Sequence, residues 1–206
     1  MKRYYAGLLF LISSIFLFRG IFRPLWCDEA LTIMNFTTLP FSRIYTEYVI
    51  ANNHILYTYL LKLWISFIPP ALYNLVFLFR LPGVFLGIVT LLLIYFLWRK
   101  YMGRNIAFIL AMTLAVSHIF MIYATAVRGY ILGLLFVVTA IDAAMNYFIH
   151  GRKKYLIFYM FASLGGIAVI PSNVIVFSLI PFLPLFFLKH IKYNSDDLGG
   201  HCRKVF

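Results

Sequence analysis

The sequence predicts an all-α polytopic membrane protein, and three observations carry this prediction. Hydrophobic residues make up 64% of the 206 residues and charged residues only 12%. The mean hydropathy is +0.93. A soluble domain has about a quarter charged residues, so this chain lacks the polar surface that water requires. Several continuous apolar runs also approach the ~20 residues with which a helix crosses the hydrocarbon core of a bilayer.

The net charge of +12 is explained by the predicted membrane topology. The basic residues gather beside apolar segments and do not form one face interleaved with aromatic residues, which argues against nucleic acid as a partner. Loops rich in Lys and Arg remain in the cytoplasm, so the clusters predict a cytoplasmic N-terminus. The clusters are Lys2-Arg3, Arg99-Lys100 with Arg104, Arg152-Lys153-Lys154, and Lys189 with Lys192.

The first membrane span is predicted over residues 4–22, as an uncleaved N-terminal helix. Arg19 and Arg23 lie at its outer end, and two interpretations of them stay open. Their side chains either extend to the lipid headgroups or attract an anionic ligand. Residues 24–80 then form the first extracytoplasmic loop, in which we expect short juxtamembrane helices.

The topology of the later spans depends on whether residues 54–80 cross the membrane. A helix over residues 55–68 would be about 21 Å long, which is short of the ~30 Å hydrocarbon core. If it crossed the membrane, Arg99-Lys100 would lie outside, against the positive-inside rule. We therefore expect residues 54–80 to form a juxtamembrane or re-entrant pair on the outer side.

The remaining spans follow by alternation and bring the predicted total to about six. Every basic cluster then lies in the cytoplasm, and the expected location is a membrane. Residues 1–192 form the predicted membrane-embedded module, and residues 193–206 form a polar cytoplasmic tail. The later spans are expected over residues 81–98, 105–123, 129–149, 155–170 and 173–188.

Ionisable side chains converge on the outer face in this topology, and such residues at membrane depth usually serve a function. Asp28 and Glu29 stand together in a chain that has only six acidic residues. A carboxylate beside cations suits group transfer, because it takes a proton from an attacking hydroxyl while the cations hold a departing phosphate. The other side chains expected at this site are His54, Lys62, Arg80, Arg128 and Tyr130.

Five short motifs follow one another along residues 1–190. They are Trp26-x-Asp28-Glu29-Ala30, Asn53-His54-x-Leu56-Tyr57-x-x-Leu60-Leu61-x-Leu63-Trp64, Arg80-Leu81-Pro82-Gly83, Tyr101-x-Gly103-Arg104 and Ala126-x-Arg128-x-Tyr130. Together they resemble the polyprenol-phosphate-dependent C-type glycosyltransferases. The resemblance is strongest to the bacterial branch related to protein O-mannosyltransferases and lipid A aminoarabinose transferases, and it implies a bacterial inner membrane as the location.

This resemblance implies transfer of a sugar from a polyprenyl-phosphate donor to an acceptor hydroxyl on the extracytoplasmic face. The acceptor would be a glycan, a lipid or a protein, and the sugar carbon would be inverted. Asp28 would be the general base, and Glu29 would orient the acceptor or share that role. No cofactor is required, although a divalent cation at Asp28 and His54 is compatible with the class.

The resemblance places the remaining site residues near the lipid-linked phosphate. His54, Arg128 and Tyr130 match positions near the donor, but Ile55 replaces the proline of the family's usual His-Pro pair. Arg80 matches an arginine that either binds the donor or has a structural role.

Structural alternatives stay open for each of these residues. Two carboxylates at the start of a helix are favoured by the helix dipole, which is the alternative for Asp28 and Glu29. His54 also fits as the neighbour of a helix cap. Lys62 fits as a side chain that extends to the lipid headgroups, and Arg128 as the anchor of a span end.

Two other classes of function are also open. The resembled family continues well beyond the length of this chain, so a truncated, non-catalytic protein that binds polyprenyl phosphate or a partner subunit is the main alternative. A small transporter is less favoured, because the ionisable residues gather at one surface and the sequence has no internal repeat.

Overall fold

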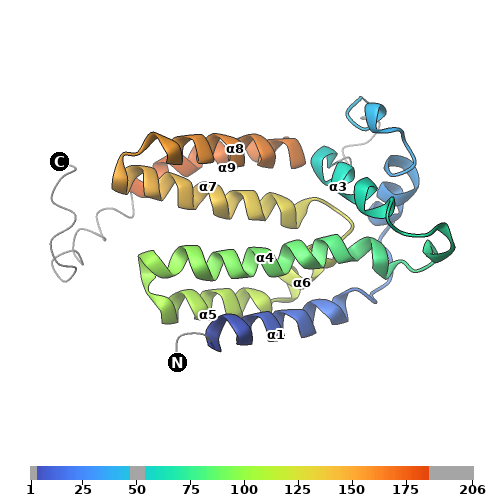
Figure 1. Cartoon of the computed structure of the whole chain (residues 1–206), viewed down its shortest axis with the longest axis horizontal. Helices are drawn as coiled ribbons and strands as arrows, with labels where there is room; N and C mark the ends of the chain where they lie inside the picture. The colour runs from blue at the N-terminus through green and yellow to red at the C-terminus, as the bar shows by residue number, and fades with distance from the viewer. Residues whose placement is uncertain (1–3, 47–53, 186–206) are drawn as a thin grey trace.

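The computed structural model describes residues 4–46 and 54–185, and within these ranges every regular element is a helix. This confirms the all-α fold class. The long helices run along the longest axis of the molecule, and their connections lie at its two ends (Figure 1). Their bounds are α1 Tyr4–Gly20, α4 Phe77–Met102, α5 Arg104–Ala115, α7 Tyr130–His150 and α8 Lys153–Val169.

A hydrophobic core joins these helices, and α4 lies in its middle. It packs against α1 and α5 on one side and against α7 on the other, and α7 packs against α8. Leu91 and Tyr95 of α4 are buried in this core together with Leu17 of α1. The exposed side chains around the bundle include large apolar ones, such as Phe10, Phe85, Ile109 and Phe161. An apolar outer surface of this kind indicates a membrane protein.

The prediction of six spans is not supported. Among the described residues, α4 and α7 are long and apolar enough to cross a membrane alone. Helix α5 and α6 (His118–Thr125) would form a third span if the bent pair is counted as one. Helices α1 and α8 each have 17 residues, which is about 26 Å and short of the ~30 Å hydrocarbon core.

The span expected over residues 105–123 is broken in the middle. Helices α5 and α6 meet at an angle of 67°. Ser117 lies in extended backbone between them, and its hydroxyl accepts a hydrogen bond from the backbone N–H of Phe120. Serine is a good N-cap residue, so Ser117 starts a new helix where the sequence pattern predicts a continuous one.

Two other predicted spans differ from the helices in the structure. Helix α4 begins at Phe77 rather than at residue 81, so Arg80 lies inside this helix. The span expected over residues 173–188 begins as α9 (Asn173–Leu179) and passes into a 3₁₀ turn over Ile180–Phe182. Pro181 in this turn has no backbone N–H to continue the α-helical ladder.

The region between α1 and α4 contains short helices. Helix α3 (Ile55–Ile65) has 11 residues, or about 16 Å. The other short helices of this region are α2 Cys27–Leu31, a π-helical turn over Thr32–Phe36, and 3₁₀ turns over Phe41–Arg43 and Pro70–Leu72.

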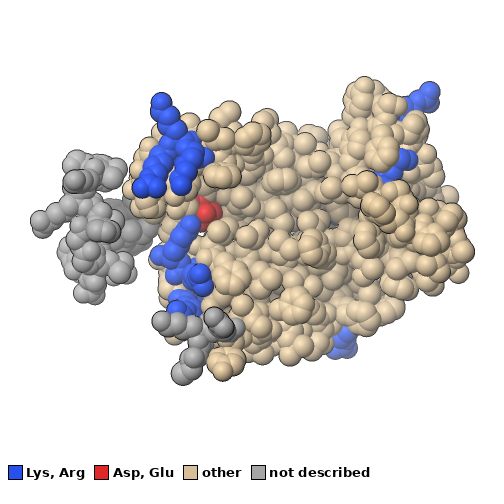
Figure 2. Space-filling model, in the orientation of Figure 1, with Lys and Arg blue, Asp and Glu red and all other residues tan. Residues whose placement is uncertain are grey.

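The two ends of the bundle differ in charge. The end that carries the α4–α5 and α7–α8 connections also carries a group of Lys and Arg side chains (Figures 1 and 2). Lys100 of this group forms an ion pair with Asp142, with 2.6 Å between Nζ and Oδ1. The opposite end carries α2, α3 and the start of α7. Lys2-Arg3, Lys189 and Lys192 lie outside the described residues.

The Arg80-Leu81-Pro82-Gly83 motif has a local structural explanation. Pro82 lies inside α4 and cannot donate a hydrogen bond to the carbonyl of Leu78. The indole N–H of Trp64 donates to that carbonyl instead, at 2.9 Å. One residue further, a Cβ at Gly83 would lie 2.5 Å from the carbonyl oxygen of Ala124. The motif therefore attaches α3 and α6 to the start of α4.

We predict that Gly83→Ala destabilises the protein by about 1–3 kcal/mol. The new methyl group would clash with a backbone carbonyl, which cannot move aside by changing rotamer as a side chain can. Thermal unfolding in lipid nanodiscs measures this loss. The matched control is Gly7→Ala in α1, where a Cβ meets nothing within 4 Å. A Gly83→Ala protein as stable as the Gly7→Ala protein would contradict the close approach of α6 to α4.

Candidate functional site

The site is built around the buried carboxylate of Glu29, whose side chain has no exposed surface. One oxygen, Oε1, accepts hydrogen bonds from Arg23 Nη2 at 2.8 Å and from the backbone N–H of Val127 at 2.9 Å. The other, Oε2, accepts from Arg23 Nη1 at 2.9 Å, from the Trp26 N–H at 3.0 Å and from Arg80 Nη2 at 3.0 Å. A buried carboxylate is tolerated only with such compensation.

Arg80 is the central cation of this cluster, and its guanidinium is also fully buried. Besides Glu29, it donates to the carbonyl oxygens of Ile21 at 2.7 Å, Arg23 at 2.6 Å and Pro24 at 3.1 Å. These carbonyls follow the end of α1, where backbone acceptors lack intrahelical partners. The geometry therefore favours the structural alternative for Arg80 over donor binding.

The pKa of Glu29 reflects these contacts. Burial raises it, but hydrogen bonds from the backbone of Trp26 and Val127 and from the side chains of Arg80 and Arg23 outweigh burial and hold the pKa below its ordinary value. The carboxylate is therefore charged at neutral pH, and its hydrogen-bonding capacity is used within the protein. This favours a structural role for Glu29 rather than the predicted catalytic one.

Asp28 faces the opposite way from its neighbour. Its side chain is 53% exposed and its Oδ2 lies 2.8 Å from Nη1 of Arg128. The two residues are 100 positions apart in the chain, and Arg128 directly follows the Val127 amide that binds Glu29. Glu29 therefore links the backbone next to Asp28 with the backbone next to Arg128.

His54 and Tyr130 lie beside the Asp28–Arg128 pair. Arg128 lies over the ring of Tyr130, with Cζ 5.0 Å from the ring centroid. The ring of His54 contacts the same tyrosine edge-on, at 5.0 Å between centroids. Gly129 makes this contact possible, since a Cβ there would lie 3.1 Å from Nδ1 of His54 and 2.5 Å from a side-chain carbon of Val169.

The imidazole of His54 is the unusual group of the site. Only 7% of the residue is exposed, and neither ring nitrogen has a hydrogen-bond partner among the described residues. Burial, followed by the positive charge of Arg128, lowers the pKa of His54 from 6.5 to about 4, and the charge of Asp28 acts in the opposite direction. The ring is therefore neutral at pH 7, with one nitrogen able to donate and the other able to accept.

Lys62 belongs to a different part of the structure. Its ammonium donates to the carbonyl oxygens of Thr37, at 2.9 Å, and Leu39. It also lies 5.2 Å from the ring centroid of Phe41. These contacts attach α3 to the segment after α2, so they favour a structural role for Lys62 over the predicted phosphate binding.

The described residues contain no group of three or more His, Cys, Asp or Glu side chains that could hold a metal ion. Close to Asp28 and His54 lies the guanidinium of Arg128, whose Nη1 donates to the Asp28 carboxylate.

Two contacts of Glu29 were not predicted. For Arg23 the sequence left open headgroup contact or attraction of an anionic ligand, but not its ion pair with Glu29, which lies six positions later. Val127 contributes its backbone N–H, and no side-chain pattern could have identified it.

A comparison with protein-family models, with curated proteins and with solved structures found no match to this chain. The class of protein therefore follows from the fold and the site alone. It is an all-helical membrane protein that has, at one end of the bundle, a buried ionic cluster and a half-exposed carboxylate paired with a largely buried arginine.

We predict that Arg80→Met lowers stability by about 3–5 kcal/mol, because it removes one partner of a buried ion pair and leaves the other charge without it. The effect is measured in nanodiscs as the loss of the folded fraction, which is determined from its resistance to trypsin. Arg104→Met removes an exposed arginine at the opposite end of the bundle and serves as the control. Equal protease resistance of the two variants would show that the cluster contributes little to folding.

We also predict a pH dependence from His54. Below about pH 6.5 the unfolded chain binds a proton at this residue, whereas the folded chain binds it only near pH 4. Stability from the neutral ring is thus present above pH 6.5 and decreases as the pH falls, by about 2 kcal/mol at pH 5. Unfolding of wild type and His54→Gln between pH 7.5 and 5 measures it.

The variant His118→Gln is the control for this experiment, since it removes an exposed histidine. It should keep the full pH dependence of wild type, while His54→Gln should lose about 2 kcal/mol of it. If His54→Gln loses as much stability as wild type between these pH values, the histidine is not buried in its neutral form.

Proposed function

We propose that this chain is the membrane-embedded module of a glycosyltransferase that moves a sugar from a polyprenyl-phosphate donor to an acceptor hydroxyl. The observation that carries this proposal is the Asp28–Arg128 pair, in which a half-exposed carboxylate lies 2.8 Å from a guanidinium. The motif resemblance of the sequence supports the same reaction. Asp28 acts as the general base and Arg128 holds the phosphate.

The reaction requires one proton transfer and one displacement at the sugar carbon. The carboxylate of Asp28 takes the proton of the acceptor hydroxyl as its oxygen attacks the anomeric carbon of the sugar. The bond between that carbon and the phosphate oxygen of the donor breaks, and its electrons remain on the departing polyprenyl phosphate. Attack from the face opposite the leaving group inverts the anomeric carbon.

Arg128 has hydrogen-bond donors left for this phosphate. Its Nη1 donates to Asp28, while its Nε is buried and has no partner among the described residues. A guanidinium can bind phosphate through two parallel hydrogen bonds, and it stabilises the charge that grows on the leaving oxygen. Because Asp28 contacts the same guanidinium, Arg128 fixes the position of the base relative to the donor phosphate.

His54 contributes to donor binding in this proposal. A neutral buried ring with both nitrogens unpaired within the described residues costs free energy unless a ligand provides the missing partner. It lies against Tyr130, which also contacts Arg128. We assign the ring to a hydrogen bond with a sugar hydroxyl or a phosphate oxygen of the donor.

The proposal leaves the Glu29 cluster outside the chemistry. Glu29 and Arg80 are positioning residues, because their hydrogen bonds end within the protein. They determine where Asp28 and Arg128 lie.

The test is a binding and transfer assay on the purified chain in lipid, with radiolabelled polyprenyl-phosphate sugars as donors. We predict that Asp28→Asn still binds donor but transfers sugar at least about 100-fold more slowly, since it lacks the general base. Arg128→Lys keeps the charge but lacks the planar fork, so donor binding weakens. Asp142→Asn, at the opposite end of the bundle, should leave transfer unchanged.

Two results would contradict the proposal. Transfer by Asp28→Asn at the wild-type rate would remove the carboxylate from the reaction. Donor binding by wild type without any transfer would overturn the enzyme assignment and favour a non-catalytic binder of polyprenyl phosphate.

A further inference from the structure

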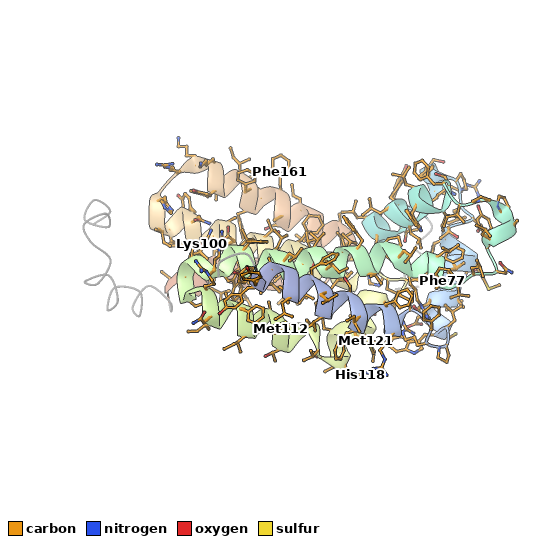
Figure 3. The ribbon with its side chains drawn as sticks, turned by 60° about the horizontal axis from the view of Figure 1, so that its bottom comes forward. Phe77, Lys100, Met112, His118, Met121 and Phe161 are labelled. Carbon is orange, nitrogen blue, oxygen red and sulfur yellow. The ribbon has the colours of Figure 1, made fainter. Side chains whose placement is uncertain are left out.

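A second site lies on the flank of the bundle, at the end of α1 and the bend between α5 and α6. It is a pocket of about 530 Å³, a size typical of ligand sites. Figure 3 shows His118 and Met121 beside the end of α1 on this flank. The pocket is lined by Phe16, Arg19, Gly20, Phe22, Arg23, Val116, Ser117, His118 and Met121.

The polar lining of this pocket is cationic or neutral. Arg19 and His118 are exposed, and neither makes a hydrogen bond or ion pair with any described residue. Arg23 is bound to Glu29 on its far side and also faces the pocket. No acidic side chain lines the pocket within the described residues. Such a lining favours an anionic ligand.

The helix bend contributes to the pocket as well. Val116 and Ser117 at the bend line it, and α6 starts there, so the positive end of a helix dipole lies at the wall. Gly20 permits the close packing beneath, since a Cβ there would lie 2.9 Å from side-chain atoms of both Met121 and Thr125. The pocket therefore belongs to the packed fold of α1 and α6.

The rim of the pocket is apolar and open to the surroundings of the bundle. Phe22 is 63% exposed and Val116 is 46% exposed, and both line the pocket. A free inorganic anion has no apolar group that could contact these surfaces, whereas the acyl chains of a lipid can pack against them. Arg19 lies in the last turn of the apolar helix α1, where basic residues extend to the headgroup layer.

We propose that this pocket binds the phosphate headgroup of an anionic glycerophospholipid, with Arg19 and His118 as its main ligands and Phe22 and Val116 against the acyl chains. The inference does not rest on the proposed sugar transfer. Neither Asp28 nor Arg128 lines this pocket, and Arg23, which does, forms its ion pair with Glu29 of the buried cluster.

The experiment measures lipid retention by native mass spectrometry on the full chain in detergent. The probes are phosphatidylglycerol, phosphatidylcholine and polyprenyl phosphate at equal mole fractions, and inorganic phosphate alone. Wild type should retain phosphatidylglycerol in preference to phosphatidylcholine. Arg19→Gln should weaken this retention about fivefold, because one basic residue near a headgroup contributes about that factor. Arg19→Gln with His118→Gln should weaken it further.

The control is Arg43→Gln, which removes an exposed arginine outside the pocket. It should retain phosphatidylglycerol as wild type does, and all variants should keep the wild-type circular dichroism spectrum. Equal retention by wild type and the double variant would overturn the proposal. So would displacement of the phospholipid by millimolar inorganic phosphate or by an equal mole fraction of polyprenyl phosphate, because a lipid bound at another site would not compete for this pocket. None of these results depends on whether the chain transfers sugar.

Discussion

The buried ion cluster of Glu29, Arg23 and Arg80 is the interaction on which the functional end of this protein depends. A carboxylate without exposed surface is stable only when donors surround it, and here they come from separate parts of the chain. Arg23 follows α1, Arg80 lies in α4, and the N–H of Val127 lies between α6 and α7. The cluster therefore joins the ends of the helices that carry the site.

This arrangement gives two adjacent carboxylates different environments. Glu29 turns inward and is saturated with hydrogen bonds, while Asp28 turns outward and meets Arg128. The backbone N–H of Val127 is bound to Glu29. Arg128, which follows Val127, is therefore held beside Asp28, which precedes Glu29. A rigid buried support beneath an accessible pair is a general way to hold reactive groups in position.

Part of this site follows from the sequence, and the reasons are physical. Apolar runs with basic residues at their ends predict the helical membrane class. They also predict that Asp28, His54, Arg128 and Tyr130 meet at one end. The different roles of Asp28 and Glu29 could not be predicted, because two of the donors to Glu29, Arg80 and the Val127 N–H, come from positions 51 and 98 residues away.

The number of membrane spans was not predictable from hydropathy for a similar reason. Ser117 ends one helix and starts another inside a continuous apolar run, with no Pro or Gly nearby to mark the break. The Arg80-Leu81-Pro82-Gly83 motif, in contrast, resembles a family motif, but its structural role follows only from its contacts. Pro82 frees a carbonyl for Trp64, and Gly83 admits a carbonyl of α6.

The most direct test of this account is a double-mutant cycle on the free energy of unfolding in lipid, with Glu29→Gln, Arg80→Met and their combination. If the two residues form one buried pair, the double variant loses less stability than the sum of the single losses. The expected coupling is about 2–3 kcal/mol, since each single variant loses the Glu29–Arg80 contact, whereas the double variant loses it only once. Additive losses would contradict the account, because they would mean that Glu29 and Arg80 act independently.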